Sequence, residues 1–267
     1  MAQQGNRYTL AELVKMVSED IDDPSFSRWQ ESEVERAIKR AVREAQGYWF
    51  EERTYEAGAY TAVTTRYKIP TYAVNVLEVW LDSPTAGEPR YLVPTRFWRR
   101  EGNELVFLEN FATYGGEDMH VIYTAHASNL LDIRAADGVT TDNVLTSVTS
   151  LFKTKGVRVG DEVVISAGSA AVNGTYYVEE VSTETSLRLD RDPGANEFAL
   201  TFEVAYHTDV PIGYLGYFAM AYLYELAGRN RPGVEVEQIQ SWASYYRQLA
   251  DLELRKNGRR MRQVRRV

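Results

Sequence analysis

The sequence contains no cysteine, and only three of its 267 residues are histidines. The absence of cysteine excludes disulfide bridges, thiolate nucleophiles and cysteine-based zinc or iron–sulfur sites. The longest apolar segment, Val210 to Ala227, includes Glu225 and two glycines, so we expect no membrane span. Because the first residues lack the charged and apolar regions of a signal peptide, we expect an intracellular protein made in a reducing compartment.

Motifs that carry chemistry are also missing. There is no glycine-rich phosphate loop, no Gly-x-Ser-x-Gly elbow and no His-Glu-x-x-His pattern. His120 and His126 fall in or near one expected strand and His207 at the end of another, as ordinary strand residues do. The acidic stretch Ser18 to Ser25 lacks the spacing of a calcium-binding EF-hand loop. We therefore expect no catalytic residue, no metal and no cofactor, and we expect that the protein is not an enzyme.

The sequence predicts two helices near the N-terminus. Thr9 and Glu12 have the spacing of a capping box, and apolar residues then recur at helical intervals from Leu10 to Ile21. Ser32 and Glu35 predict a second capping box before a helix with an apolar face. Its opposite face carries charges of both signs, typical of a solvated surface or of a contact with a neighbouring subunit: Glu33, Arg36, Lys39, Arg40, Arg43 and Glu44.

Short strand-like runs follow from Thr54 to about Ala127 and predict an antiparallel sheet. Residues 139–190 then have the pattern of a small SH3-like β-barrel, in which the pair Asn173-Gly174 predicts a type I′ hairpin turn. This segment has no basic cluster, which favours a structural or partner-contact role for the barrel over nucleic-acid binding.

Two more helices are expected near the C-terminus. Pro211 favours a helix start and Gly228 a stop, and the segment between them is apolar nearly all round. Such a helix must be covered on every side, either at the centre of the fold or by another subunit, with Gly213 and Gly216 allowing close approach. We expect a second helix from about Val234 to Lys256. Its apolar stripe comprises Ile239, Trp242, Ala243, Tyr246, Leu249 and Ala250.

The predicted fold class is α+β, with a helical bundle of N- and C-terminal helices, an inserted antiparallel β-sheet and the small barrel insertion. Residues 1–138 form the N-terminal helices and the sheet of a main domain, and 139–190 form the barrel. Residues 191–256 return as a strand and the C-terminal helix pair. Residues 257–267 are a basic tail that follows a helix end at Asn257-Gly258.

Charge is distributed unevenly along the chain. The formal net charge is −8, but Arg255 to Val267 contains seven basic residues and no acidic one. The remaining residues, 23 basic and 38 acidic, therefore carry −15. Met261, Val264 and Val267 recur every third residue between the arginines, which predicts a narrow apolar stripe if this segment becomes helical on docking.

Several stretches together resemble the head-to-tail connector, or adaptor, proteins of tailed bacteriophages. They are Tyr8-Thr-Leu-Ala-Glu-Leu-Val-Lys-Met-Val, the segment Arg28-Trp to Ala45, Ile69-Pro to Asp82, Gly102 to Leu108, and Val210-Pro to Tyr224 followed by Ala243-Ser-Tyr-Tyr-Arg-Gln-Leu. The resemblance spans most of the chain but excludes residues 139–190. It implies a structural virion protein, made in the host cytoplasm, that assembles as a ring, usually of twelve copies, in the neck between capsid and tail.

The resemblance also implies partners and contact residues. The ring would bind the portal protein on one side and tail or neck proteins on the other, and DNA would pass through it without specific binding, repelled by a negative lumen. The basic tail would bind the portal through Arg255, Lys256, Arg259, Arg260, Met261, Arg262, Val264, Arg265, Arg266 and Val267. The candidates for contact between subunits are Tyr214, Tyr217, Phe218 and Tyr224.

Other interpretations stay open at this point. The arginine-rich segment suits phosphates as well as carboxylates, so a nucleic-acid-binding protein is the main alternative. A tail or baseplate completion protein would share the fold but dock elsewhere. A disordered segment that serves only solubility is the simplest alternative for the tail itself.

Overall fold

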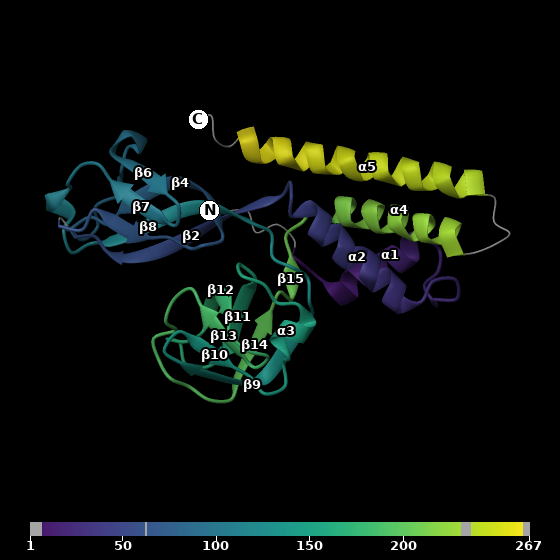
Figure 1. Ribbon diagram of the computed structural model, residues 1–267, viewed down its shortest axis with the longest axis horizontal. Helices are drawn as coiled ribbons and strands as arrows, with labels where there is room; N and C mark the ends of the chain where they lie inside the picture. Colours follow the sequence, from purple (N-terminus) through teal and green to yellow (C-terminus); the bar gives the residue numbers. More distant parts are fainter. Residues whose placement is uncertain (1–6, 62, 231–235, 264–267) are drawn as a thin grey trace. The chain divides into compact units, whose positions relative to one another are not determined.

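The computed structural model describes residues 7–61, 63–230 and 236–263. In that part of the chain it contains five α-helices and antiparallel β-sheets, one of which closes into a six-stranded barrel (Figure 1). The predicted α+β class is confirmed. The chain divides into two compact units, Met1–Trp49 with Ala127–Val267, and Phe50–His126. The sheet that we expected within the main domain is thus a unit of its own, because its apolar side chains form a separate core.

The unit Phe50–His126 consists of two antiparallel sheets, with strand orders β2-β8-β4-β5 and β3-β7-β6. Met119, Val121 and Tyr123 of β8 share one face, because alternate residues of a strand do so, and all three are fully buried. The strands and 3₁₀ turns are β2 (Phe50–Ala59), β3 (Arg66–Lys68), β4 (Ala73–Leu81), β5 (Tyr91–Leu92), η1 (Thr95–Phe97), β6 (Trp98–Glu101), β7 (Glu104–Phe107), η2 (Ala112–Tyr114) and β8 (Asp118–His126).

In the other unit, α1 spans Leu10–Asp20 and begins at the predicted capping box. The backbone N–H of Thr9 donates to Glu12 Oε2 at 2.8 Å, and the backbone N–H of Glu12 donates to Thr9 Oγ1 at 3.3 Å. These bonds satisfy two of the N–H groups that a helix start leaves without a partner. Just before the helix, β1 (Tyr8–Thr9) pairs with β15 (His207–Thr208).

The second helix, α2 (Glu31–Ala45), begins earlier than the sequence predicted. The capping box expected at Ser32 and Glu35 is wrong, because the backbone N–H of Gln30 donates to Glu33 Oε2 at 2.9 Å and the helix is already formed at Ser32. The apolar face is confirmed, and its residues are almost fully buried: Val34, Ala37, Ile38, Ala41, Val42 and Ala45.

A buried carboxylate organises the loop between these helices. Asp23 accepts hydrogen bonds from the backbone N–H groups of Ser27, Arg28 and Trp29 at 2.8, 2.9 and 2.8 Å, and from the Ser27 hydroxyl at 2.6 Å. The bond from the Ser27 hydroxyl, together with the three N–H bonds, lowers the pKa of Asp23 to about 2. This compact loop is why the chain enters α2 two residues before the predicted cap.

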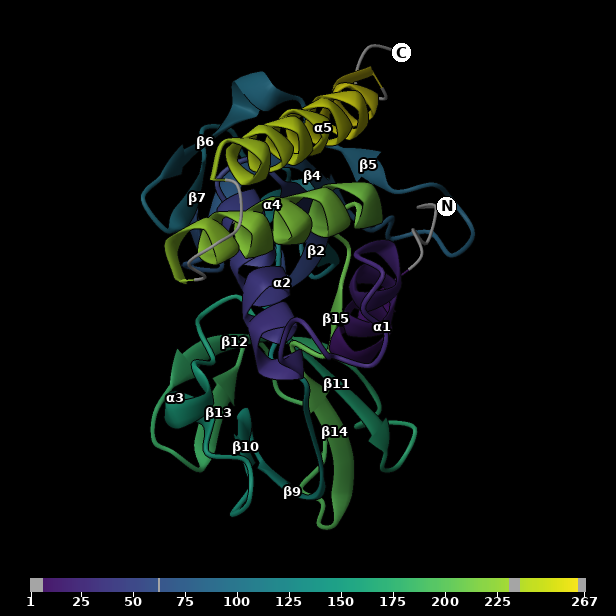
Figure 2. The ribbon, with the colours of Figure 1, turned by 90° about the vertical axis from the view of Figure 1, so that its right-hand side faces the viewer.

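The apolar helix α4 (Ile212–Asn230) lies among three helices of its own chain. It packs against α1, α2 and α5 (Val236–Gln263), and Figure 2 shows α5 running along it. A Cβ atom at Gly213 would lie 3.1 Å from Glu253 Cγ of α5, and one at Gly216 would lie 3.3 Å from Met16 Cε of α1. The two glycines therefore allow close approach of helices within the chain.

Both C-terminal helices extend beyond their predicted ends. α4 passes Gly228 and ends at Asn230, and a Cβ atom at Gly228 would lie 3.3 Å from Ile239 Cγ2. α5 continues through the pair Asn257-Gly258. The Asn257 side-chain amide donates to the Glu253 carbonyl oxygen at 3.0 Å, so this asparagine continues the helix instead of capping it.

The barrel has the closed strand order β10-β13-β12-β11-β14-β9. Its elements are β9 (Ile133–Thr141), β10 (Val144–Thr146), α3 (Phe152–Lys155), β11 (Glu162–Ala167), β12 (Gly174–Val181), β13 (Ser186–Leu189) and β14 (Leu200–Val204). It extends beyond the predicted range 139–190 on both sides. β9 and β14 pair with each other, with Ile133 opposite Val204, and this pairing closes the barrel and removes its free edges.

The predicted type I′ turn at Asn173-Gly174 is wrong. Neither residue has the positive φ that this turn requires. Gly174 is the first residue of β12 and pairs with Ile165 of β11, and the chain between the two strands forms a longer loop. The Asn173 side chain donates to the Gly168 carbonyl oxygen at 3.1 Å across this loop.

Candidate interaction surfaces

The four candidate subunit-contact residues of α4 lie against their own chain. Tyr214 and Phe218 are 3% and 4% exposed and belong to the helical core. Tyr217 and Tyr224 are half-buried and stack on Tyr246 of α5, with ring centroids 6.4 and 5.7 Å apart. Burial raises the pKa of the Tyr214 hydroxyl. The sequence did not show whether the apolar helix is covered by its own chain or by a second subunit. Here α5 of the same chain covers Tyr217 and Tyr224.

A second apolar stripe, which the sequence did not reveal, lies on the exposed side of α5. Trp242, Tyr245 and Leu252 are 44%, 55% and 59% exposed, and with half-buried Leu249 they follow a three-four-three spacing along the helix. Trp242 and Leu249 were both expected on the buried stripe, but Trp242 is exposed and Leu249 is only half-buried. The Trp242 ring packs edge-on against the ring of Tyr224, with ring centroids 5.2 Å apart, and nearly half of the Trp242 surface stays exposed. Large apolar side chains in a row on an exposed helix are typical of a partner-binding face.

The basic end of α5 continues this helix. Arg255 and Lys256 are exposed, and the Lys256 ammonium lies 3.2 Å from Glu253 Oε1. The helical backbone extends through Gln263. The side chains of the other predicted portal-binding residues lie outside the part that the structure describes: Arg259, Arg260, Met261, Arg262, Val264, Arg265, Arg266 and Val267.

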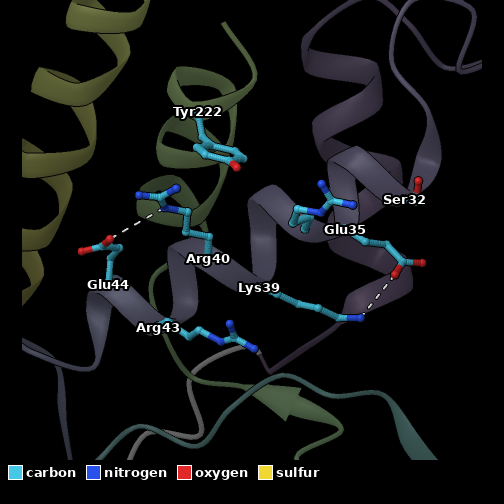
Figure 3. Close-up of a pocket in the computed structure, with 8 residues that line it drawn as sticks. Ser32, Glu35, Lys39, Arg40, Arg43, Glu44 and Tyr222 are labelled. Atoms are coloured by element: carbon cyan, nitrogen blue, oxygen red, sulfur yellow. Dashed lines mark hydrogen bonds and ion pairs between the residues drawn. The ribbon is translucent and has the colours of Figure 1, made fainter. Parts of the chain in front are cut away.

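A cationic groove runs along α2, with a volume of about 640 Å³ (Figure 3). We define it by its lining residues, which include four basic and two acidic side chains: Ser32, Glu35, Arg36, Lys39, Arg40, Arg43, Glu44 and Tyr222. Lys39 and Arg40 each lie three or four positions from both Arg36 and Arg43, so the four side chains lie on neighbouring parts of one side of the helix. The formal charge of the groove is +2, in a chain whose net charge is −8.

Contacts inside the groove distinguish two pairs of basic residues. Lys39 Nζ lies 3.3 Å from Glu35 Oε2 and Arg40 Nε lies 3.8 Å from Glu44 Oε1, as the dashed lines in Figure 3 show. Arg40 also lies over the ring of Tyr222, 4.7 Å from its centroid. Lys39 and Arg40 therefore each have an acidic partner within the groove.

The other two basic residues of the groove, Arg36 and Arg43, are exposed. Neither has an ion-pair partner among residues 7–61, 63–230 and 236–263. The sequence showed the charges of α2, but it gave no signal that Tyr222 of α4 forms the opposite wall, because that contact joins segments far apart in the chain.

His120, Asp82 and Arg90 form a cluster of charged and polar side chains. Buried His120 lies 3.1 Å from Asp82 Oδ1, and Arg90 Nε lies 2.6 Å from the same atom. Burial opposes ionisation of Asp82, but His120 and Arg90 outweigh it and keep the pKa of this carboxyl below its usual value. Among the residues that the structure describes, no three histidine or acidic side chains are grouped closely enough to hold a metal ion.

No protein-family model matches the sequence, and no curated protein matches it either. Within the described residues, no helix is both long enough and apolar enough to cross a membrane. Function must therefore be inferred from the exposed stripe and basic end of α5 and from the cationic groove of α2.

Proposed function

We propose that this protein is a head-to-tail adaptor of a tailed bacteriophage, a structural virion protein without catalytic residues. It assembles as a ring under the portal in the neck of the virion, docks its basic C-terminal segment on the portal and links the DNA-filled capsid to the tail. The family resemblance of the N-terminal, sheet and C-terminal segments motivates this proposal. In the same proposal the helices are a bundle of the adaptor kind, and the barrel is an SH3-like insertion.

The observation that carries the proposal is α5. At 1.5 Å per residue, its 28 residues extend about 42 Å. One side packs on α4, another exposes Trp242, Tyr245 and Leu252, and the C-terminal end leads into the basic segment. A long helix with an uncovered apolar stripe and a concentrated positive charge at one end suits attachment to another protein with an acidic surface.

The sharpest test separates portal binding from DNA binding. The full-length protein, a form that ends at Leu254, and the variant M261S/V264S/V267S are each offered to an immobilised portal ring and to a DNA duplex. The proposal predicts capture of the full-length protein, loss of capture on truncation, and a clear loss in the variant, which keeps every arginine. Capture that is unchanged by truncation would overturn the docking role of the tail.

The main alternative is a nucleic-acid-binding protein that uses Arg255 to Arg266 as an electrostatic arm. It predicts that the serine variant binds duplex as well as the full-length protein, with a slope of log K against log salt near −6 for about seven phosphate contacts. Under the adaptor proposal the form ending at Leu254, with a formal charge of −15, binds DNA weakly or not at all. A tail or baseplate completion protein would instead be captured by tail components and ignore the portal.

A further inference from the structure

The cationic groove of α2 has an electrostatic counterpart elsewhere in the same chain. Glu19, Asp20 and Asp22, at the end of α1, are all exposed. Their only ion-pair partner among the described residues is Lys15, which lies 4.0 Å from Glu19. Together with Lys15, these three residues carry a formal charge of −2, and the adjacent buried carboxylate of Asp23 adds one more negative charge. The acidic end is therefore opposite in sign to the groove.

The acidic end is unfavourable in the isolated chain. The last turn of α1 contains no basic residue, so within that turn no positive charge offsets the unfavourable interaction of the Glu19 and Asp20 carboxylates with the negative end of the helix dipole. Asp20 is exposed as a residue, but its carboxylate lies near Gly216 of α4, and this partial burial, followed by the neighbouring charge of Glu19, raises its pKa. A positively charged partner would relieve both effects.

The groove favours a protein carboxylate over a nucleic-acid backbone. Glu35 and Glu44 lie within it and neutralise Lys39 and Arg40. Arg36 and Arg43 are the two basic residues of the groove without an ion pair to another described residue, seven residues or about 10 Å apart along the helix. Two such guanidinium groups match a compact group of two or three carboxylates, which they bind by paired hydrogen bonds. A long run of phosphates would instead need an extended row of basic side chains without acidic neighbours.

We propose that the cationic groove binds the acidic end of α1, Glu19, Asp20 and Asp22, from a second copy of this chain. This inference rests on the proposed ring, for which it supplies a subunit contact. Because groove and acidic end are different patches, the contact is head-to-tail: repeated, it gives a ring when the rotation between copies closes and an open filament when it does not, whereas reciprocal contact between two copies gives only a dimer.

The test uses two variants that reverse opposite sides of the contact. R36E/R43E changes the groove, and E19K/D20K changes the acidic end. K68E/K155E is the matched control for the first, because both lysines are exposed and the charge change is the same. Self-association is measured by sedimentation velocity at low ionic strength, where exposed charges are least screened, over concentrations that reach the millimolar range.

The proposal predicts that each reversal alone weakens self-association by about 10- to 100-fold, since like charges then face each other. An equimolar mixture of the two reversals should restore association, because the unchanged groove of one meets the unchanged acidic end of the other and the two reversed patches also attract. K68E/K155E should associate like the unmodified chain.

Three results would overturn the proposal. The first is that the unmodified chain stays monomeric over the whole concentration range. The second is that R36E/R43E self-associates as strongly as the unmodified chain. The third is that the equimolar mixture of the two reversals does not associate. If R36E/R43E instead loses affinity for a DNA duplex and keeps its self-association, the groove is a phosphate site. If the mixture associates only as far as dimers, the contact is supported and the ring is contradicted. If R36E/R43E still forms rings, this contact is refuted but the ring is not.

Discussion

The helices α4 and α5 lie side by side and are both rich in aromatic residues, yet they serve different purposes. α4 is enclosed by its own chain, and Leu215 and Leu223 are fully buried. α5 buries one side against α4 and exposes Trp242, Tyr245 and Leu252 on another. The first helix completes the core, and the second presents apolar surface that the described residues do not cover. An apolar sequence therefore predicts that a helix is buried against other elements, but only the packed structure shows which of its apolar residues stay exposed to a partner.

Shortening a buried side chain of α4 should reduce stability more than any other change considered below. Leu223→Ala should lower the free energy of unfolding by about 2–5 kcal/mol, because it removes buried apolar contacts and leaves a cavity. Leu252→Ala, the same change on exposed α5, should alter it by no more than about 0.5 kcal/mol. Urea unfolding followed by circular dichroism measures both. Equal losses would contradict the distinction between the two helices.

The loop between α1 and α2, which contains Asp23, provides a pH-dependent test. Because the pKa of Asp23 is about 2 in the folded protein and the usual pKa of an aspartate is 3.8, the ionised side chain stabilises the fold above pH 3.8. That contribution is lost as pH falls toward 2. Asp23→Ala should therefore lower Tm by several degrees at neutral pH, and the difference from the unmodified protein should shrink in acid. Glu19→Ala, at an exposed neighbour, is the control, and a difference that does not depend on pH would contradict the assignment.

The close approach of α1 to α4 can be tested at Gly216. Gly216→Leu should destabilise the protein by about 1–3 kcal/mol, because the larger side chain must displace Met16 and separate the two helices. Gly216→Ala adds one methyl group, which meets only the flexible end of Met16, and alanine favours the helix. The alanine variant should therefore unfold at a urea concentration close to that of the unmodified protein. A leucine variant as stable as the alanine variant would show that the packing here is looser than described.

The smallest effect on stability is expected for the exposed stripe of α5. Trp242→Ser with Tyr245→Ser should cost about 0.5–1.5 kcal/mol, mainly from the lost contact between Trp242 and Tyr224. The same double variant should lose partner capture, which Leu223→Ala in its folded state should keep. Unfolding and capture are measured on the same preparations. A loss of stability as large as that of Leu223→Ala would place the stripe in the core.

Local patterns in the sequence predicted much of the fold. The Thr9–Glu12 capping box and the buried face of α2 follow from the spacing of near neighbours, and the strands around Val79 and Leu105 from their strand-like runs, all of which a sequence displays directly. The start of α2 was misplaced because the carboxylate of Asp23 receives hydrogen bonds from residues that no cap rule includes.

Features that depend on distant segments could not be predicted in the same way. The barrel closes through β9 and β14, whose partner residues Ile133 and Val204 are far apart in sequence. The groove needs Tyr222 opposite Arg40, and the exposure of Trp242 depends on how α5 is rotated on α4. Periodicity gives the faces of a helix, whereas the choice between two apolar faces is made only when the helix packs.

The most direct test of the adaptor proposal is the mass of the particle formed with a portal ring, measured by native mass spectrometry for the full-length chain and for the form ending at Leu254. The account predicts that each portal ring binds a fixed number of full-length copies, each adding 30.4 kDa, and that the truncated form adds none. A full-length chain that adds no mass to the portal but binds DNA through residues 255–267 would contradict the account and establish the nucleic-acid-binding alternative.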